Sequence, residues 1–348
     1  MHHVTAPFIF LAAASLALGA AGERPLTFSL PDSILLFGTY DDLRVAKPER
    51  EIRLKAPADA CGKYNGGYFA SPTISPRGDV IAWGFCTRWV QTRRQNRARF
   101  ALGLYSVAKE TWQIYGDFDD IGTTAYSASG SRIAFVARQN DWQQLLIFDV
   151  AKQSWTAAPY PTGGLRQNAA LSWSPDEKHL VVEVQRGGPP YSAQASEGDA
   201  NRNSVIGVLD IVSGTVRMLG EGYDPAWSPD GQWIAYFAPG GARCLLVHPD
   251  GTGIRVVKSF RQNFFSSRSF VWGGPVWSPD SRQLLFTASA SETYVDLMLL
   301  DLVSGRTAMK LRKGYPAYGW AISPGTRQSE DHFASVVSGA NRWLAVEN

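Results

Sequence analysis

One short segment repeats along the chain and constrains the fold more than any other feature. Its clearest copy runs from Asp224 to Phe237, where an apolar lead ending in Trp227 is followed by Ser-Pro-Asp-Gly and a second apolar run. Pro229 fixes φ in the turn, the Asp230 side chain can bond nearby backbone, and Gly231 tolerates the conformation at the exit. The segment therefore predicts a strand, a tight turn and a second strand.

Copies of this segment recur at a nearly constant spacing. The serines that mark them are Ser29, Ser75, Ser127, Ser174, Ser228, Ser278 and Ser323. Successive serines lie 45 to 54 residues apart, and most units carry four strand signals. A period near 50 residues with four strands per unit is typical of a β-propeller. The sequence therefore predicts an all-β fold, a β-propeller of four-stranded antiparallel blades, with seven blades by the number of serines.

Six blades are the alternative, because the last unit is one strand short. Its strand signals are Gly319–Ile322, Phe333–Val337 and Arg342–Val346. Propellers commonly close by letting an N-terminal strand complete the last blade. Leu26–Leu30 can do this instead of leading a blade of its own.

The N-terminus has the pattern of a secretory signal. The apolar run from Phe8 to Ala21 is too short to span a bilayer comfortably, and Gly19-Ala20-Ala21 offers small residues to a signal peptidase. Residues 1–22 are therefore expected to be cleaved, leaving 23–348 as a single propeller domain, periplasmic or secreted, without a transmembrane segment. Because the first residues lack Lys and Arg, an uncleaved anchor or a buried strand is the alternative.

The three cysteines fit an oxidising compartment. Cys61 and Cys86 flank the first strand pair of one unit and are candidates for a disulfide, whereas Cys244 is expected to be buried in a strand. The chain has no Cys-x-x-Cys and no nearby His, so the spacing does not suggest zinc.

The blade geometry predicts which face binds. Strands alternate in direction, so turns after first and third strands share one face, and links after second and fourth strands share the other. The longer links fall on the second face, which we term the long-loop face. They are Phe85–Phe100, Gln185–Asn203, Gly116–Gly122, Tyr160–Asn168 and Ser259–Gly273. Long loops on a rigid scaffold are where binding usually resides.

Two of these links supply candidate binding residues. Arg88, Trp89, Arg93 and Arg94 belong to a segment with five arginines, whose planar side chains suit carboxylate or phosphate. Phe264 and Phe265 lie in an aromatic link, which is either an interface or a cap on the core.

Two further sets of residues are candidates on the same face. Tyr223 and Asp224 precede an inner strand, where the carboxylate can line a central pocket or simply serve a turn. Asp117, Asp119 and Asp120 form an acidic group in a Gly-bounded loop, which is either a Ca²⁺ site or a solvated loop. The loop is too short for an EF-hand. No other cofactor is indicated.

The Trp-Ser-Pro-Asp-Gly segment resembles the WD40-like (PD40) repeat of TolB-like propellers, with its best matches at Pro225–Phe237 and Pro275–Phe286. The resemblance covers about residues 26–346. The same repeat occurs in the propeller domains of prolyl-oligopeptidase relatives and in some polysaccharide lyases. The extra α/β domains of TolB and of the peptidases have no counterpart here, and no Gly-x-Ser-x-Gly elbow follows a strand. The resemblance implies a stand-alone exported propeller that contacts proteins or ligands.

Taken together, these features favour a non-catalytic binding or scaffold module with a protein partner or an anionic ligand. The alternative is an enzyme, lactonase-like or polysaccharide-lyase-like, with a site in the central axial pocket. The scarcity of His favours the first, because His179, His248 and His332 are the only ones beyond the signal and lie far apart in the repeat. A net charge of +3 gives no support to nucleic-acid binding.

Overall fold

The computed structural model describes residues 35–39, 42–46, 51–54, 73–91, 96–140, 142–160, 170–185, 204–239, 243–260, 271–278, 280–291 and 294–313. All regular elements in these ranges are β-strands. Within them, no helix is long and apolar enough to cross a membrane. The expected signal segment and the last repeat unit lie outside the described residues.

The described strands form six antiparallel sheets, and in each sheet the strands follow chain order. The first sheet contains β1 (Leu35–Thr39), β2 (Asp42–Ala46) and β3 (Glu51–Leu54). The second contains β4 (Thr73–Ile74), β5 (Val80–Gln91), β6 (Asn96–Ser106) and β7 (Thr111–Phe118). The third contains β8 (Asp120–Tyr126), β9 (Arg132–Gln139), β10 (Trp142–Asp149) and β11 (Ser154–Ala157).

The other three sheets repeat this arrangement. The fourth contains β12 (Leu171–Trp173), β13 (His179–Gln185), β14 (Ser204–Asp210) and β15 (Val216–Glu221). The fifth contains β16 (Tyr223–Trp227), β17 (Ile234–Phe237), β18 (Arg243–Val247) and β19 (Arg255–Ser259). The sixth contains β20 (Val271–Trp277), β21 (Gln283–Ser291), β22 (Tyr294–Asp301) and β23 (Thr307–Lys313).

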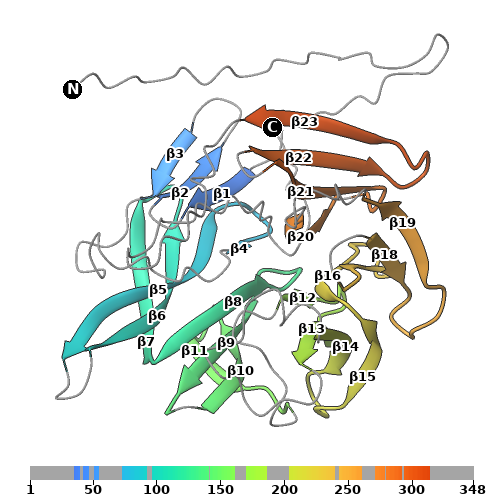
Figure 1. Ribbon diagram of the computed structural model, residues 1–348. Helices are drawn as coiled ribbons and strands as arrows, with labels where there is room; N and C mark the ends of the chain where they lie inside the picture. Colours follow the sequence, from blue (N-terminus) through green and yellow to red (C-terminus); the bar gives the residue numbers. More distant parts are fainter. Residues whose placement is uncertain are drawn as a thin grey trace, which may run out of the picture.

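The sheets follow one another around a common centre (Figure 1). Strands β4, β8, β12, β16 and β20 lie nearest the centre, and neighbouring inner strands contact each other. The predicted four-stranded antiparallel blades are confirmed. The number of blades stays a prediction, because the residues that decide between seven and six lie outside the described ranges.

Each repeated turn is held by its serine side chain. In the copy at Ser228, the hydroxyl accepts a hydrogen bond from the Trp233 N–H at 2.9 Å and donates one to the Asp230 carboxylate at 2.6 Å. Ser174 and Ser278 make the same pair of bonds within their own turns. These serines are buried, and a buried hydroxyl without partners is costly. Hydrogen bonding therefore fixes serine at this position.

The fourth residue of each turn, which follows the Ser-Pro-Asp positions, has a left-handed backbone conformation. It is glycine at Gly78, Gly130 and Gly231, with φ of +72°, +75° and +77°. Glu177 and Ser281 take the same place with φ of +58° and +59°, which costs a side-chain-bearing residue roughly 1–2 kcal/mol. The side chains of both exceptions bond to the preceding sheet, and these contacts offset the strain.

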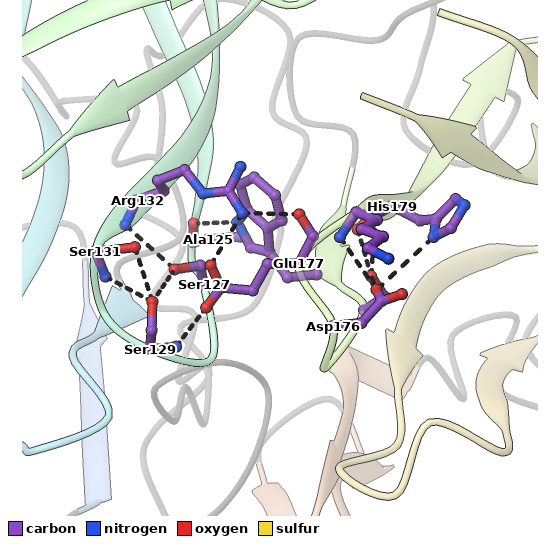
Figure 2. A network of polar contacts seen from close by, with 11 residues as sticks. Ala125, Ser127, Ser129, Ser131, Arg132, Asp176, Glu177 and His179 are labelled. Carbon is purple, nitrogen blue, oxygen red and sulfur yellow. Dashed lines mark hydrogen bonds and ion pairs between the residues drawn. The ribbon is translucent and has the colours of Figure 1, made fainter. Parts of the chain in front are cut away.

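Figure 2 shows how the turns join the third sheet to the fourth. Glu177 accepts a hydrogen bond from the Ser129 N–H at 2.5 Å and pairs with Arg132 Nη2 at 3.0 Å. The Arg132 guanidinium also lies over the Trp173 ring, and Trp173 Nε1 donates to the Ala125 carbonyl at 3.0 Å. The tryptophan and the turn of the repeat therefore bind consecutive sheets together.

The core lies between neighbouring sheets rather than in one central mass. One apolar cluster joins the second and third sheets and includes Phe100, Phe135 and Phe148. Another joins the fifth and sixth sheets through Phe237 and Trp277. Because the third, fourth and fifth sheets are covered on both faces, their inner strands read as nearly continuous apolar runs.

Candidate binding face

Strands β5 and β6 extend beyond the rest of their sheet. Strand β4 pairs only with Ile81 and Ala82 of β5, and β7 stops pairing with β6 at Phe100. Past these points Arg88–Gln91 and Asn96–Arg99 continue as a two-stranded ribbon, here termed the arm, which projects to the left in Figure 1. The predicted loop over 85–100 was wrong for the described residues. Cross-strand pairing keeps this polar segment extended, although its composition resembles a loop.

The register of the arm places two arginines directly opposite each other. Arg88 pairs with Arg99, and like charges in this position repel. Asp117 lies between them: its Oδ2 accepts from Arg88 Nη2 at 2.7 Å and its Oδ1 from Arg99 Nε at 3.0 Å. The hydrogen bond from Arg99, aided by the positive charge of both arginines, lowers the pKa of the Asp117 carboxyl. Asp117 therefore fastens the base of the arm.

The other predicted acidic residues also have arginine partners. Asp119 pairs with Arg99 and accepts a hydrogen bond from the Asn140 N–H at 2.6 Å, while Asp120 Oδ2 lies 3.5 Å from Arg138 Nη2. Asp117 and Asp120 lie in strands β7 and β8, so the predicted loop was wrong here too. In the described part of the chain, no group of three or more His, Cys, Asp or Glu is placed to hold a metal ion.

The two faces of the arm differ in chemistry. Arg88, Val90, Arg97 and Arg99 share one face, because Val90 pairs with Arg97 two positions beyond the Arg88–Arg99 pair. Trp89 lies on the other face with its side chain 43% exposed. Arg93 and Arg94 lie outside the described residues, as do Phe264 and Phe265.

A second polar group lies where β13 ends and β16 begins. Glu183 is only 2% exposed, and its carboxylate accepts a hydrogen bond from the Ser204 hydroxyl at 2.5 Å. The Asp224 N–H lies 3.5 Å from the other carboxylate oxygen, and Asp224 has a left-handed φ of +52°. Asp224 thus meets a buried carboxylate near the axis.

Tyr223 is a core residue and does not present its ring on the surface, contrary to its expected binding role. It is 4% exposed and packs against Phe237. Burial, together with the charges of Asp224 and Glu183, raises the pKa of its hydroxyl. Strand β16 begins at Tyr223, one residue before the predicted start of the repeat copy at Asp224, so Tyr223 belongs to the strand itself.

The structure separates the carboxylates that an axial enzyme site would need to combine. Asp117 is bound by arginines of β5 and β6, whereas Asp224 lies beside Glu183 of β13. Of the histidines in the described residues, His179 begins β13 and His248 follows β18. Both therefore lie on the face of the short turns, opposite the arm.

Sequence reasoning missed Glu183, Arg138 and Trp142. Glu183 interrupts an apolar run, Leu-Val-Val-Glu-Val, and an acidic residue within a buried strand was the available signal. Trp142 is 65% exposed and begins β10 on the long-loop face. Arg138 pairs opposite Asp120 across β8 and β9, and no local signal predicts that pairing.

The cysteines agree in part with expectation. Cys244 is free and fully buried, and burial raises its thiol pKa to about 12. Cys86 is disulfide-bonded. Cys61 lies outside the described residues, so its pairing with Cys86 stays a prediction.

The sequence matches no protein-family model and no curated protein. Solved structures share the fold. TolB from Acinetobacter baumannii has a TM-score of 0.58 at 15% identity, over 88% of this chain and 66% of that one. A TolB-like protein from Agrobacterium tumefaciens has a TM-score of 0.54 at 17% identity, over 89% of this chain and 99% of that one.

Two other neighbours have different roles. A chain of a nidogen–laminin complex has a TM-score of 0.59 at 9% identity, over 91% of this chain and all of that one (100%). Oligogalacturonate lyase in complex with manganese has a TM-score of 0.50 at 15% identity, over 79% of this chain and 72% of that one. At such identities the likeness concerns the fold, and the fold serves several functions. This chain has the β-propeller fold of TolB-like proteins.

Proposed function

We propose that this chain is an exported, non-catalytic binding or scaffold module that holds a protein partner or an anionic ligand through its long-loop face. The arm carries this proposal. It extends beyond its sheet on that face, and its Arg88 and Trp89 side chains are 58% and 43% exposed. Arginine and tryptophan are enriched at the centres of protein interfaces.

Two further observations support the proposal. The fold is shared with a chain that was solved in a complex of two proteins. The sequence pattern of residues 1–22 is typical of a secretory signal and supports export to the periplasm or the exterior. The acidic residues Asp117 and Asp119 at the base of the arm are bound by arginines.

The second candidate is an enzyme with its site near the axis. The fold neighbour oligogalacturonate lyase and the buried Glu183 beside Asp224 favour it. Against it, the two described histidines lie on the opposite face. A substrate screen with Glu183→Gln as the control decides this candidate: a turnover that the substitution abolishes would support it.

The binding proposal is tested by an affinity pull-down from the exported fraction. The bait is the intact protein or a variant in which 88–99 is replaced by a short Gly-Ser turn. Lys109→Ala with Lys152→Ala serves as the control on the opposite face. A partner held by the intact and control proteins and lost with the arm supports the proposal. A folded, arm-shortened protein that holds the same partners contradicts it.

A further inference from the structure

Two exposed tryptophans lie on one face of the third sheet. The pairing of β9, β10 and β11 continues residue by residue, with Trp142 opposite Gln139 and Trp155 opposite Phe148. Side chains that lie opposite each other, or two residues apart on one strand, share a face of the sheet. Trp142 and Trp155 therefore belong to the same face, and they are 65% and 38% exposed.

The middle of this face is core, and its outer part is exposed. Leu146 and Phe148 lie on it and belong to the apolar cluster that joins the second and third sheets. Beside them, the exposed Gln144 and Ala157 lie between the two tryptophans. The exposed residues form a row that we term the tryptophan strip: Trp142, Gln144, Ala157 and Trp155.

The sheet holds the two rings far apart. Trp155 lies across from Phe148, which is six residues beyond Trp142 on β10, so the strip is about 20 Å long. Phe118 of β7 packs against Trp155 with ring centroids 5.4 Å apart. The neighbouring sheet therefore fixes the orientation of this ring without covering it.

This face of the described strands carries no charged side chain. Its residues in β9, β10 and β11 are Ile133, Phe135, Ala137, Gln139, Trp142, Gln144, Leu146, Phe148, Trp155 and Ala157. A ligand of the strip therefore meets aromatic rings and amides rather than ions.

The two glutamines supply hydrogen-bonding groups beside the rings. An amide side chain both donates and accepts hydrogen bonds, as sugar hydroxyls do. The Gln139 Oε1 atom is shielded from solvent and has no hydrogen-bond partner among the described residues. Its amide can therefore turn toward a ligand hydroxyl without breaking a hydrogen bond at this oxygen.

We propose that the tryptophan strip binds a neutral oligosaccharide in an extended conformation. The C–H groups on the flat side of a sugar ring are attracted to the negative face of an indole. An extended chain of several sugars can reach both tryptophans and hydrogen-bond to Gln139 and Gln144 on the way. This inference goes beyond the proposed function, because it uses neither the arm nor its arginines.

A neutral saccharide fits the strip better than an anionic ligand or a protein. An anion finds no cation on this face of β9, β10 and β11 to bind it. A protein interface concentrates its apolar and aromatic area at its centre. Here the polar Gln144 and the small Ala157 occupy the centre, and the tryptophans stand at the two ends.

The test uses four neutral oligosaccharides: cellohexaose, mannohexaose, xylohexaose and chitohexaose. Isothermal titration calorimetry is carried out with the intact protein, Trp142→Ala, Trp142→Phe and the control Met218→Ala. Met218 is 55% exposed and lies on β15 of the fourth sheet. We expect at least one saccharide to bind. Trp142→Ala should weaken it about tenfold, Trp142→Phe about threefold or less, and Met218→Ala should leave it unchanged.

The arm-shortened protein should bind the saccharide as tightly as the intact protein, which separates this site from the proposed one. Failure of all four saccharides to bind at millimolar concentration overturns the inference, and so do equal losses in Trp142→Ala and Met218→Ala. Tighter binding of polygalacturonate or of a single-stranded oligonucleotide also overturns it. If Trp142→Ala loses a pull-down partner that no saccharide displaces, the strip is a protein interface and the inference fails. Circular dichroism verifies that each variant is folded.

Discussion

At the scale of single residues, the left-handed position after each turn serves two purposes. Glycine takes it where only the backbone conformation matters. Glu177 takes it where a side chain is needed between sheets, and its carboxylate bonds Ser129 and Arg132. Burial opposes ionisation there, but hydrogen bonds from Ser129 and Arg132 prevail and lower the pKa of Glu177.

Glu177→Gln is therefore expected to destabilise the fold by about 1–2 kcal/mol at pH 7, since it keeps the side-chain length and removes the charge. Because the folded pKa is lowered, this contribution is present above about pH 4.3 and is lost as the pH falls through the folded value. Urea unfolding at pH 7 and pH 3 measures the difference, which should shrink in acid. Glu110→Gln, also at a positive φ of +53°, is the control. Equal losses in both variants would refute the role of the inter-sheet contact.

The cysteines give a second prediction at this scale. Burial raises the Cys244 thiol pKa to about 12, so it should not react with a thiol reagent in the folded protein. If Cys61 and Cys86 are bridged, the non-reduced chain should show one reactive thiol after denaturation and none before. Three reactive thiols after denaturation would exclude the bridge.

At the scale of elements, the arm is an exposed ribbon that needs fastening. Two-stranded ribbons are marginally stable in water, and the Arg88–Arg99 pair adds repulsion at the base. The Asp117 carboxylate forms an ion pair with each of the two guanidinium groups and so offsets their repulsion. Arg88, Arg99 and Asp117 therefore hold the arm in place, which gives the cluster of arginine and aspartate at its base a structural role.

Asp117→Asn is expected to loosen the arm while changing global stability by less than about 1 kcal/mol, because Asp117 and its partner Arg88 are solvent-exposed. Hydrogen exchange should rise at 88–91 and 96–99 but not in strand β13. Lys152→Gln, which removes an exposed ion pair with Asp149, is the control. Unchanged exchange in the arm would show that Asp117 does not fasten it.

Adding calcium provides an independent test of whether these aspartates are held by arginines or bind a metal ion. Asp117 and Asp119 are paired with Arg99, and Asp120 faces Arg138, so calcium would have to displace guanidinium groups. We expect the same melting temperature in EDTA and in millimolar Ca²⁺. A rise with Ca²⁺ that Asp119→Asn abolishes would establish the metal site instead.

At the scale of the whole molecule, stability depends on contacts between successive sheets. Trp173 and Trp277 donate from Nε1 to Ala125 and Ala226 of the preceding inner strands, each at 3.0 Å. These bonds are buried, so losing the donor leaves a carbonyl without its partner. At Trp173 and Trp277, the aromatic residue before the turn serine therefore links sheets as well as filling the core.

Trp277→Phe is expected to cost about 1–3 kcal/mol, because it removes the donor to Ala226 and part of the ring. Trp227→Phe is the matched comparison: Trp227 Nε1 donates to Gly231 within its own turn, at 3.2 Å, where water can replace it. Thermal unfolding should show the larger loss for Trp277→Phe. Similar losses would mean that ring size, not the inter-sheet bond, sets the cost.

The sequence by itself determined the sheets and their order around the axis. The serine, proline and glycine of each turn act through contacts within a few residues, so their spacing predicts the strand pairs. The alternation of strand direction then identified the long-loop face. The sequence alone did not reveal how far each strand runs, and it led to the wrong prediction that the arm is a loop.

Only the tertiary structure decided which side chains meet. Asp117 finds Arg88 and Arg99 across two strands, Asp224 lies beside Glu183 from another sheet, and Tyr223 enters the core. These contacts join residues far apart in the chain, and no local pattern encodes their register. The fold could thus be predicted from local chemistry, whereas the candidate site depends on long-range pairing that appears only when the sheets pack together.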